Sequence, residues 1–271
     1  MKTDIRTRNN VRVLGRTEGP VLLFAHGFGC DQGMWQHVLP HFTDDYKVVV
    51  FDHVGAGGSD LDAYEPEKYS TLDGYVSDVL ELCEDLDLED VTFIGHSVSA
   101  MMAVAAAARK PDRLGRIILV APSASYMDYP EDGYTGGFSR ADLDDLLVSL
   151  DTNYLVWAAT MAPVIMGNPD TPALGTRLED SFCRVNPAIA RQFARVAFLS
   201  DVRHLLKDVS LPTLIMQASA DLLAPDHVGV YLQERIPGST LVRMEATGHL
   251  PHVSAPKETA GIISQYLQQS T

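Results

Sequence analysis

Short, continuous apolar runs alternate with amphipathic segments along the first half of the chain. The runs at residues 21–25, 48–52, 91–94 and 117–121 have the length and β-branched content of buried strands. Between them, residues 72–86 carry apolar side chains at helical spacing, which predicts a helix with one buried face. Strands that alternate with helices indicate an α/β fold with a mostly parallel, doubly wound sheet.

The two ends of the chain extend this pattern. Residues 1–20 alternate polar and apolar positions around Val11 and Val13, which predicts an edge hairpin antiparallel to the main sheet. Residues 34–42 follow the first buried strand and are expected to form a helix. After the middle of the chain, we expect a strand at 214–218, a helix at 226–236, a strand at 240–244 and a helix at 258–267.

The alternation stops near Ser125, and no further buried strand is expected before about His204. Helical segments are expected at 139–150, 153–162, 171–186 and 187–200, ending in turns at Pro163, Pro169 or Asn186-Pro187. These four helices interrupt the sheet, so we expect residues 126–203 to be an inserted helical lid. Residues 1–125 and 204–271 then form the core.

Composition narrows the class of protein. The chain has 271 residues, 46% of them hydrophobic, which suits one α/β domain with an insertion. A net charge of −15 disfavours nucleic acid and anionic membranes as partners. Three widely spaced cysteines predict reduced thiols, and we expect no metal site and no cofactor. With no signal peptide and no membrane span expected, the predicted location is cytoplasmic.

The stretch Gly95-His96-Ser97-Val98-Ser99 joins a predicted strand to an uncharged helix rich in Ala and Met. A strand that becomes a helix within two residues strains its middle residue and needs small neighbours at two positions either side. The pattern is that of the nucleophile elbow of an α/β-hydrolase, G-x-S-x-G, with Ser99 replacing the last glycine. A five-residue match alone does not exclude a serine that merely caps the helix.

Two glycine-rich loops follow the first two buried strands. His26-Gly27-Phe28-Gly29 is expected to aim backbone N–H groups inward, and the Phe28 and Val98 N–H groups would form an oxyanion hole. The alternative is a plain glycine turn. The loop at 52–60 lacks the spacing of a phosphate-binding loop and is interpreted as structural.

Ser97, Asp221 and His249 occur in the order typical of an α/β-hydrolase triad, each just beyond a predicted parallel strand. His249 would take the serine proton, and Asp221 would hold the imidazole tautomer. The competitors that stay open are His252 for the base and Asp226 or Asp201 for the acid. His26 and His96 flank the site and are interpreted as supporting residues.

Several stretches together resemble one branch of this fold. They are 95–102 (GHSVSAMM), 26–32 (HGFGCDQ), 134–138 (YTGGF), 248–252 (GHLPH), 189–195 (IARQFAR) and 198–201 (FLSD). They are similar to the bacterial sigma-B stress regulator RsbQ and to the plant karrikin and strigolactone receptors. The lid stretches resemble the bacterial regulator most, and Ser99 is shared with the plant receptors. The resemblance covers nearly the whole chain.

The resemblance implies a small apolar pocket under a four-helix lid. The matching positions are Phe28, His96, Tyr126, Phe138, Trp157, Met161, Phe193 and Phe198. It also implies slow hydrolysis of a small hydrophobic ester or lactone through an acyl-enzyme, coupled to signalling. A PAS-domain phosphatase as protein partner is implied by the resemblance alone. The alternatives are a ligand-binding switch with slow or single-turnover hydrolysis, and a plain metabolic carboxylesterase.

Overall fold

The computed structural model describes residues 4–269. A seven-stranded sheet runs in the order β1-β3-β2-β4-β5-β6-β7. Its strands are β1 (Arg12–Gly15), β2 (Val21–Ala25), β3 (Lys47–Val50), β4 (Val91–His96), β5 (Leu114–Val120), β6 (Thr213–Ser219) and β7 (Thr240–Thr247). All neighbouring pairs are parallel except β1 with β3. The mostly parallel α/β sheet expected from the sequence is confirmed.

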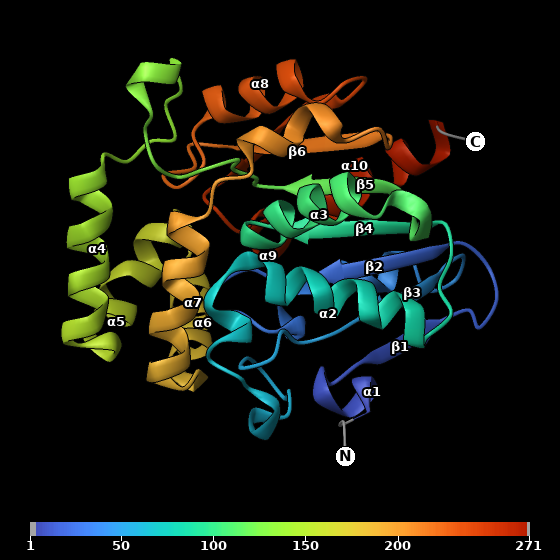
Figure 1. Cartoon of the computed structure of the whole chain (residues 1–271), viewed down its shortest axis with the longest axis horizontal. Helices are drawn as coiled ribbons and strands as arrows, with labels where there is room; N and C mark the ends of the chain where they lie inside the picture. The colour runs from blue at the N-terminus through green and yellow to red at the C-terminus, as the bar shows by residue number, and fades with distance from the viewer. Residues whose placement is uncertain (1–3, 270–271) are drawn as a thin grey trace.

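Helices cover both faces of this sheet (Figure 1). One face packs against α2 (Leu72–Asp85), α3 (Val98–Arg109) and α8 (Asp226–Arg235), and the other against α10 (Pro256–Gln269). Neighbouring strand residues divide between these two cores, since Leu23 faces α2 and α3 while Leu22 shares a cluster with α10. The strands are therefore buried on both sides, which is why they are continuously apolar.

Four helices lie between β5 and β6 in the chain and stand together beyond one end of the sheet (Figure 1). They are α4 (Arg140–Thr152), α5 (Tyr154–Met166), α6 (Pro172–Arg184) and α7 (Pro187–Leu199). α5 and α6 reach the loops that follow β7 and β2, because His249 N–H donates to the Ile165 carbonyl and Ser181 Oγ donates to the Gly29 carbonyl. The helices thus cover the carboxyl edge of the sheet, where ligands bind in open α/β folds.

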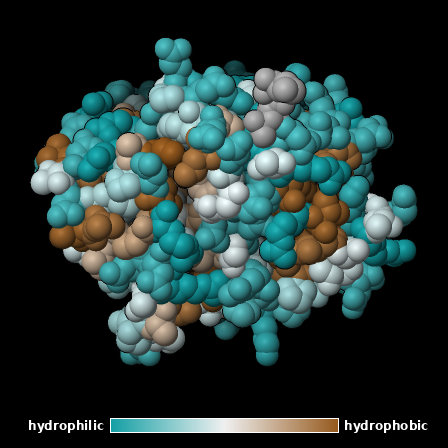
Figure 2. Space-filling view, turned by 90° about the horizontal axis from the view of Figure 1, so that it is seen from below, coloured by the Kyte–Doolittle hydropathy of each residue, from teal (hydrophilic) through white to brown (hydrophobic). Residues whose placement is uncertain are grey.

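The remaining short elements lie in the connections. They are α1 (Ile5–Arg8), η1 (Gln32–Trp35), η2 (Leu39–His41), η3 (Leu61–Ala63), η4 (Lys68–Ser70), η5 (Pro111–Arg113), η6 (Pro130–Asp132), η7 (Arg203–Asp208) and α9 (Pro251–Ser254). Within residues 4–269, no helix has the length and apolar character needed to cross a membrane. The surface in Figure 2 is mostly hydrophilic, with separate hydrophobic groups. Exposed apolar side chains of α4 and α5 are Val148, Leu155, Val156 and Val164.

Three local predictions need correction. The antiparallel edge position expected for residues 1–20 is confirmed by β1, which pairs with β3, but no hairpin forms within residues 4–20, because residues 5–8 form α1 instead of a second strand. Residues 1–3 of that segment lie outside the described residues. Residues 34–42 form 3-10 turns instead of a helix, since Pro40 cannot donate a helical hydrogen bond. Pro163 lies inside α5, which ends later at Gly167 with a left-handed backbone (φ +64°).

Candidate active site

The connection between β4 and α3 has the strained geometry expected of a nucleophile elbow. Ser97 has φ +57° and ψ −120°, a backbone conformation that a serine rarely adopts. A Cβ atom added to Gly95 would lie 2.2 Å from the Ser99 carbonyl oxygen, so a larger residue cannot stand there. The steric interpretation of the small residue before Ser97 is confirmed. The turn leaves the Ser97 hydroxyl beside the residues that follow β6 and β7.

The side chains of Ser97, His249 and Asp221 form one hydrogen-bonded line. His249 Nε2 lies 2.7 Å from Ser97 Oγ, and His249 Nδ1 lies 2.8 Å from Asp221 Oδ2. The other carboxylate oxygen accepts the N–H groups of Leu223 (2.9 Å) and Ala224 (3.1 Å), which fixes the orientation of Asp221. With Nδ1–H donating to the carboxylate, Nε2 presents its lone pair to the serine hydroxyl.

The three competing residues lie elsewhere. His252 is fully buried with its ring between Trp35 and His96, and neither ring nitrogen has a hydrogen-bond partner among residues 4–269. Burial lowers the pKa of His252 to about 3, so it stays neutral. Asp226 is exposed and pairs with Arg243, and Asp201 pairs with Arg203. None of the three residues hydrogen-bonds to Ser97 or His249 in the described structure.

The backbone of His249 is held on two sides. His96 Nε2 donates to the His249 carbonyl at 2.8 Å, which supports its interpretation as a supporting residue. Burial, followed by the neighbouring imidazoles of His252 and His249, holds the pKa of His96 well below its ordinary value. On the other side, His249 N–H donates to the Ile165 carbonyl of α5 at 3.0 Å. A helix of the lid therefore contacts the loop that carries the base.

The loop after β2 is hydrogen-bonded to the elbow through the His26 carbonyl. The His26 carbonyl accepts hydrogen bonds from Ser99 Oγ and from His53 Nε2 (3.1 Å). The Gly27 carbonyl accepts from His26 Nδ1 (2.9 Å) and from Cys30 N–H (3.3 Å). This turn places Phe28 against the same cavity as Ser97. The roles of the Phe28 and Val98 N–H groups as oxyanion donors stay predictions.

Asp52 gives the second glycine-rich loop its structural role. Its Oδ1 accepts Gln32 N–H at 2.8 Å, while its Oδ2 accepts Gly58 N–H at 2.8 Å and Asn10 Nδ2 at 2.7 Å. The carboxylate thus accepts hydrogen bonds from three chain segments. The interpretation of residues 52–60 as a structural loop is confirmed. Among the residues that the structure describes, no group of three or more His, Cys, Asp or Glu could hold a metal ion.

The cavity above Ser97 is nearly closed, with a volume of about 20 Å³, room for about one water molecule. Of the expected pocket residues, Phe28, His96, Tyr126 and Phe198 line it. The other four, Phe138, Trp157, Met161 and Phe193, do not line it. Lining residues that were not expected include Cys30, Ile165, Leu178, Phe182, Leu223 and Leu250.

The misplaced pocket residues have other partners. Phe193 stacks on Tyr75 with ring centroids 4.5 Å apart and contacts the rings of His53 and Phe28 in T-shaped geometry. Trp157 and Met161 line a separate groove between α4 and α5. Phe138 lies before α4, where it forms an isolated backbone bridge with Met127. The other three residues lie on lid helices at apolar spacing, which does not distinguish the face toward the cavity from the face toward a neighbouring helix.

Tyr126 contacts the candidate nucleophile directly, whereas the sequence analysis placed it only among the residues of the pocket. Its hydroxyl lies 3.0 Å from Ser97 Oγ, and the side chain is fully buried. Burial raises the pKa of Tyr126 above its ordinary value, so the phenol keeps its proton. Since the Ser97 hydroxyl donates to His249, the Tyr126 hydroxyl donates to Ser97 Oγ. The one sequence signal was its position shortly after a strand that ends at the site.

The seven-stranded sheet and the serine at a strained strand-to-helix turn are features of one class of protein. Comparison with models of known protein families identifies the same class. The family model described as alpha/beta hydrolase fold matches residues 20–256. The chain belongs to the alpha/beta hydrolase family.

Three similar proteins narrow the comparison. A karrikin insensitive 2 receptor of Petunia hybrida is 37% identical over 264 residues, covering 97% of each chain. A strigolactone esterase of Pisum sativum is 36% identical over 270 residues, covering 99% of this chain and 100% of its own length. The solved structure of a hydrolase from Oleispira antarctica superposes with a TM-score of 0.93 at 42% identity, covering 98% of this chain and 96% of the other. The chain is therefore related to plant receptors and esterases and to a hydrolase from Oleispira antarctica.

Proposed function

We propose that this protein is a serine hydrolase that cleaves a small hydrophobic ester or lactone. The observation that carries the proposal is the continuous line Ser97 Oγ–His249–Asp221, with distances of 2.7 Å and 2.8 Å, at the floor of an apolar cavity. A serine hydroxyl becomes a nucleophile when a neighbouring base accepts its proton. The walls of the cavity favour apolar groups, since Phe28, Phe182 and Phe198 are among them.

The reaction follows from this geometry. Ser97 Oγ attacks the carbonyl carbon while its proton passes to His249 Nε2, and Asp221 stabilises the resulting imidazolium. The Phe28 and Val98 N–H groups stabilise the oxyanion of the tetrahedral intermediate. His249 then donates the proton to the leaving oxygen, which leaves an acyl-enzyme on Ser97. Water attacks this ester with His249 again as base, and the acid is released. With a lactone, the leaving hydroxyl remains attached to the acyl chain.

Hydrolysis of p-nitrophenyl acetate and butyrate tests the proposal. Ser97→Ala removes the nucleophile, so we expect kcat to fall roughly 10³-fold or more, as it does when a member of a catalytic triad is lost. Ser149→Ala changes an exposed serine of α4 and is the matched control. Equal rates for wild type and Ser97→Ala would reject the triad.

A second candidate function, a ligand-binding switch, is favoured by the closed cavity and by the contact of α5 with His249. A ligand larger than a water molecule must move the lid to reach Ser97, so binding and lid position are linked. The similarity to plant receptors supports the same idea. A burst of product followed by a near stop, with a ligand-dependent rise in Tm of Ser97→Ala, would favour the switch over a fast esterase.

A role like that of the bacterial stress regulator, with a PAS-domain phosphatase as partner, rests on the sequence resemblance alone and stays a proposal. The cytoplasmic location, expected because the sequence predicts no signal peptide and no membrane span, also stays a proposal. The test of the partner is a pull-down between the purified protein and PAS-domain phosphatases of its own organism. No binding in the presence or absence of ligand would remove this partner.

A further inference from the structure

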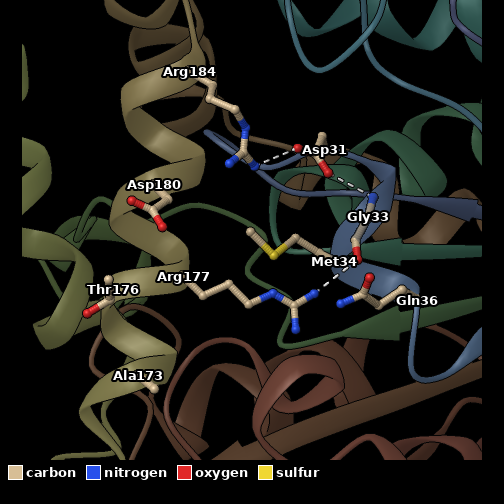
Figure 3. Close-up of a pocket in the computed structure, with 9 residues that line it drawn as sticks. All are labelled: Asp31, Gly33, Met34, Gln36, Ala173, Thr176, Arg177, Asp180 and Arg184. Carbon is tan, nitrogen blue, oxygen red and sulfur yellow. Dashed lines mark hydrogen bonds and ion pairs between the residues drawn. The ribbon is translucent and has the colours of Figure 1, made fainter.

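The lid helix α6 contacts the loop after β2 at three places. Ser181 Oγ donates to the Gly29 carbonyl at 2.8 Å, Arg184 pairs with Asp31 at 2.9 Å, and Arg177 donates to the Gly33 carbonyl at 3.0 Å. Figure 3 shows the two arginines reaching from α6 to this loop across a groove. The helix residues are three or four apart, so one face of α6 makes all the contacts.

The contact of Ser181 differs from the other two in its surroundings. Ser181 is 2% exposed, and its hydrogen bond is buried. Arg184 is exposed and Asp31 is partly exposed, so solvent screens their ion pair, and the hydrogen bond from Arg177 to Gly33 is only partly buried. The neighbouring Phe182 packs directly on Gly29, where an added Cβ would lie 2.0 Å from its ring. Gly29 also has a left-handed backbone (φ +69°), so the chain passes under α6 at a point where only glycine fits.

Two planar peptide groups connect the Gly29 carbonyl to the Phe28 N–H. The first plane contains the Gly29 carbonyl and the Cys30 N–H, which donates to the Gly27 carbonyl at 3.3 Å. The second plane contains that Gly27 carbonyl and the Phe28 N–H. Because both groups are rigid, a hydrogen bond at one end restrains the direction of the N–H at the other.

We propose that Ser181 is a positioning residue that holds the Phe28 N–H in the direction needed for oxyanion binding, so that the lid completes the site. The inference rests on the proposed serine hydrolase function. From the core side, Ser99 and His53 hold the His26 carbonyl of the same loop. From the lid side, Ser181 supplies the buried contact. Movement of α6 away from the core breaks this hydrogen bond, so an open lid lowers the rate of the chemical step.

The test compares Ser181→Ala with Thr176→Ala, which removes an exposed hydroxyl from the same helix. A misdirected oxyanion donor weakens binding of the transition state more than that of the substrate. We therefore expect Ser181→Ala to lower kcat for p-nitrophenyl acetate roughly tenfold, in both acylation and deacylation, with KM within about twofold. Ser181→Thr keeps the hydroxyl and should retain most of kcat, and Thr176→Ala should match wild type.

A transition-state analogue separates positioning from general damage. In the adduct of n-butylboronic acid, a bond forms between Ser97 Oγ and boron while the serine proton passes to His249. The tetrahedral oxygens then reach the oxyanion donors. We expect the Ki of Ser181→Ala to rise by the same factor as kcat falls, with its Tm measured alongside.

The outcomes distinguish the inference from the proposed function. Unchanged kcat and Ki in Ser181→Ala overturn the inference and leave the hydrolase proposal in place. An equal fall in Thr176→Ala, or a change in KM alone, also overturns it, because either result points to altered lid packing. Esterase activity that does not depend on Ser97 overturns both.

Discussion

Acidification from pH 7.5 to 5.5 is expected to destabilise the folded state through three buried histidines. His53, His96 and His252 are each fully buried, and burial is the largest cause of the lowered pKa in each. An unfolded histidine has a pKa of about 6.5 and takes up a proton in this pH range. The folded state does not, since the pKa of His252 is about 3. The contribution of these neutral histidines to the free energy of unfolding is therefore fully present above pH 6.5 and is lost as the pH falls toward 3.

The size of the loss follows from proton linkage. For one histidine that stays neutral in the folded state, the free energy of unfolding drops by about 1.4 kcal/mol between pH 7.5 and 5.5. The pKa values of His53 and His96 are lowered in the same direction, so both residues add to this loss. Carboxylates contribute little here, because their ordinary pKa values lie near 4. The loss is a large fraction of the typical stability of a domain.

Urea unfolding at the two pH values, followed by tryptophan fluorescence, measures this loss. The ring of Trp35 packs against that of His252 with ring centroids 4.2 Å apart, so its emission reports the loss of this packing. In His252→Leu, the loss between the two pH values should shrink by about 1.4 kcal/mol. The control Val253→Ala alters the next buried residue and should reduce stability equally at both pH values. Equal losses in wild type and His252→Leu would show that His252 is protonated in the folded state and would refute the reasoning.

Three further predictions concern the site and the thiols. Tyr126→Phe removes the donor to Ser97 Oγ and should lower kcat by roughly 10-fold with a small change in KM. Kinetics with p-nitrophenyl esters measure both constants. An unchanged kcat would show that this hydrogen bond does not contribute to the reaction. Gly29→Ala should cost at least about 2 kcal/mol in urea unfolding and abolish activity, because its Cβ collides with Phe182 and φ is positive. In the folded protein, Ellman's reagent should label Cys183 rapidly and the other two thiols only after unfolding, since both are buried. Rapid labelling of more than one thiol would contradict this assignment.

Much of the fold could be predicted because local sequence sets element type. Buried strands such as β2 and β4 are short apolar runs, and α2 has an apolar period of 3.6 residues. The prediction failed where a neighbour decided the outcome. The antiparallel edge position of β1 could be predicted, but its partner β3 could not, because the two strands are far apart in the chain.

The candidate site likewise contains residues that the sequence could predict and residues that it could not. Gly95, Ser97 and the order Ser97–Asp221–His249 could be found because the elbow is a local steric requirement and each triad residue follows a strand. The walls of the cavity could not be found in full, since Phe193 and Phe198 lie on the same helix but face different partners. Periodicity indicates an apolar face and does not indicate which neighbour covers it.

By itself, the sequence determined the α/β class, the elbow and the three residues in line at the carboxyl edge of the sheet. The tertiary structure alone decided how closely the lid covers them. It brought the Ser181 hydroxyl to the Gly29 carbonyl across 152 positions of the chain, and the Tyr126 hydroxyl to Ser97 across 29. Strand and helix follow from backbone sterics within a few residues. Contacts between distant segments depend on how whole helices pack, which no local pattern records.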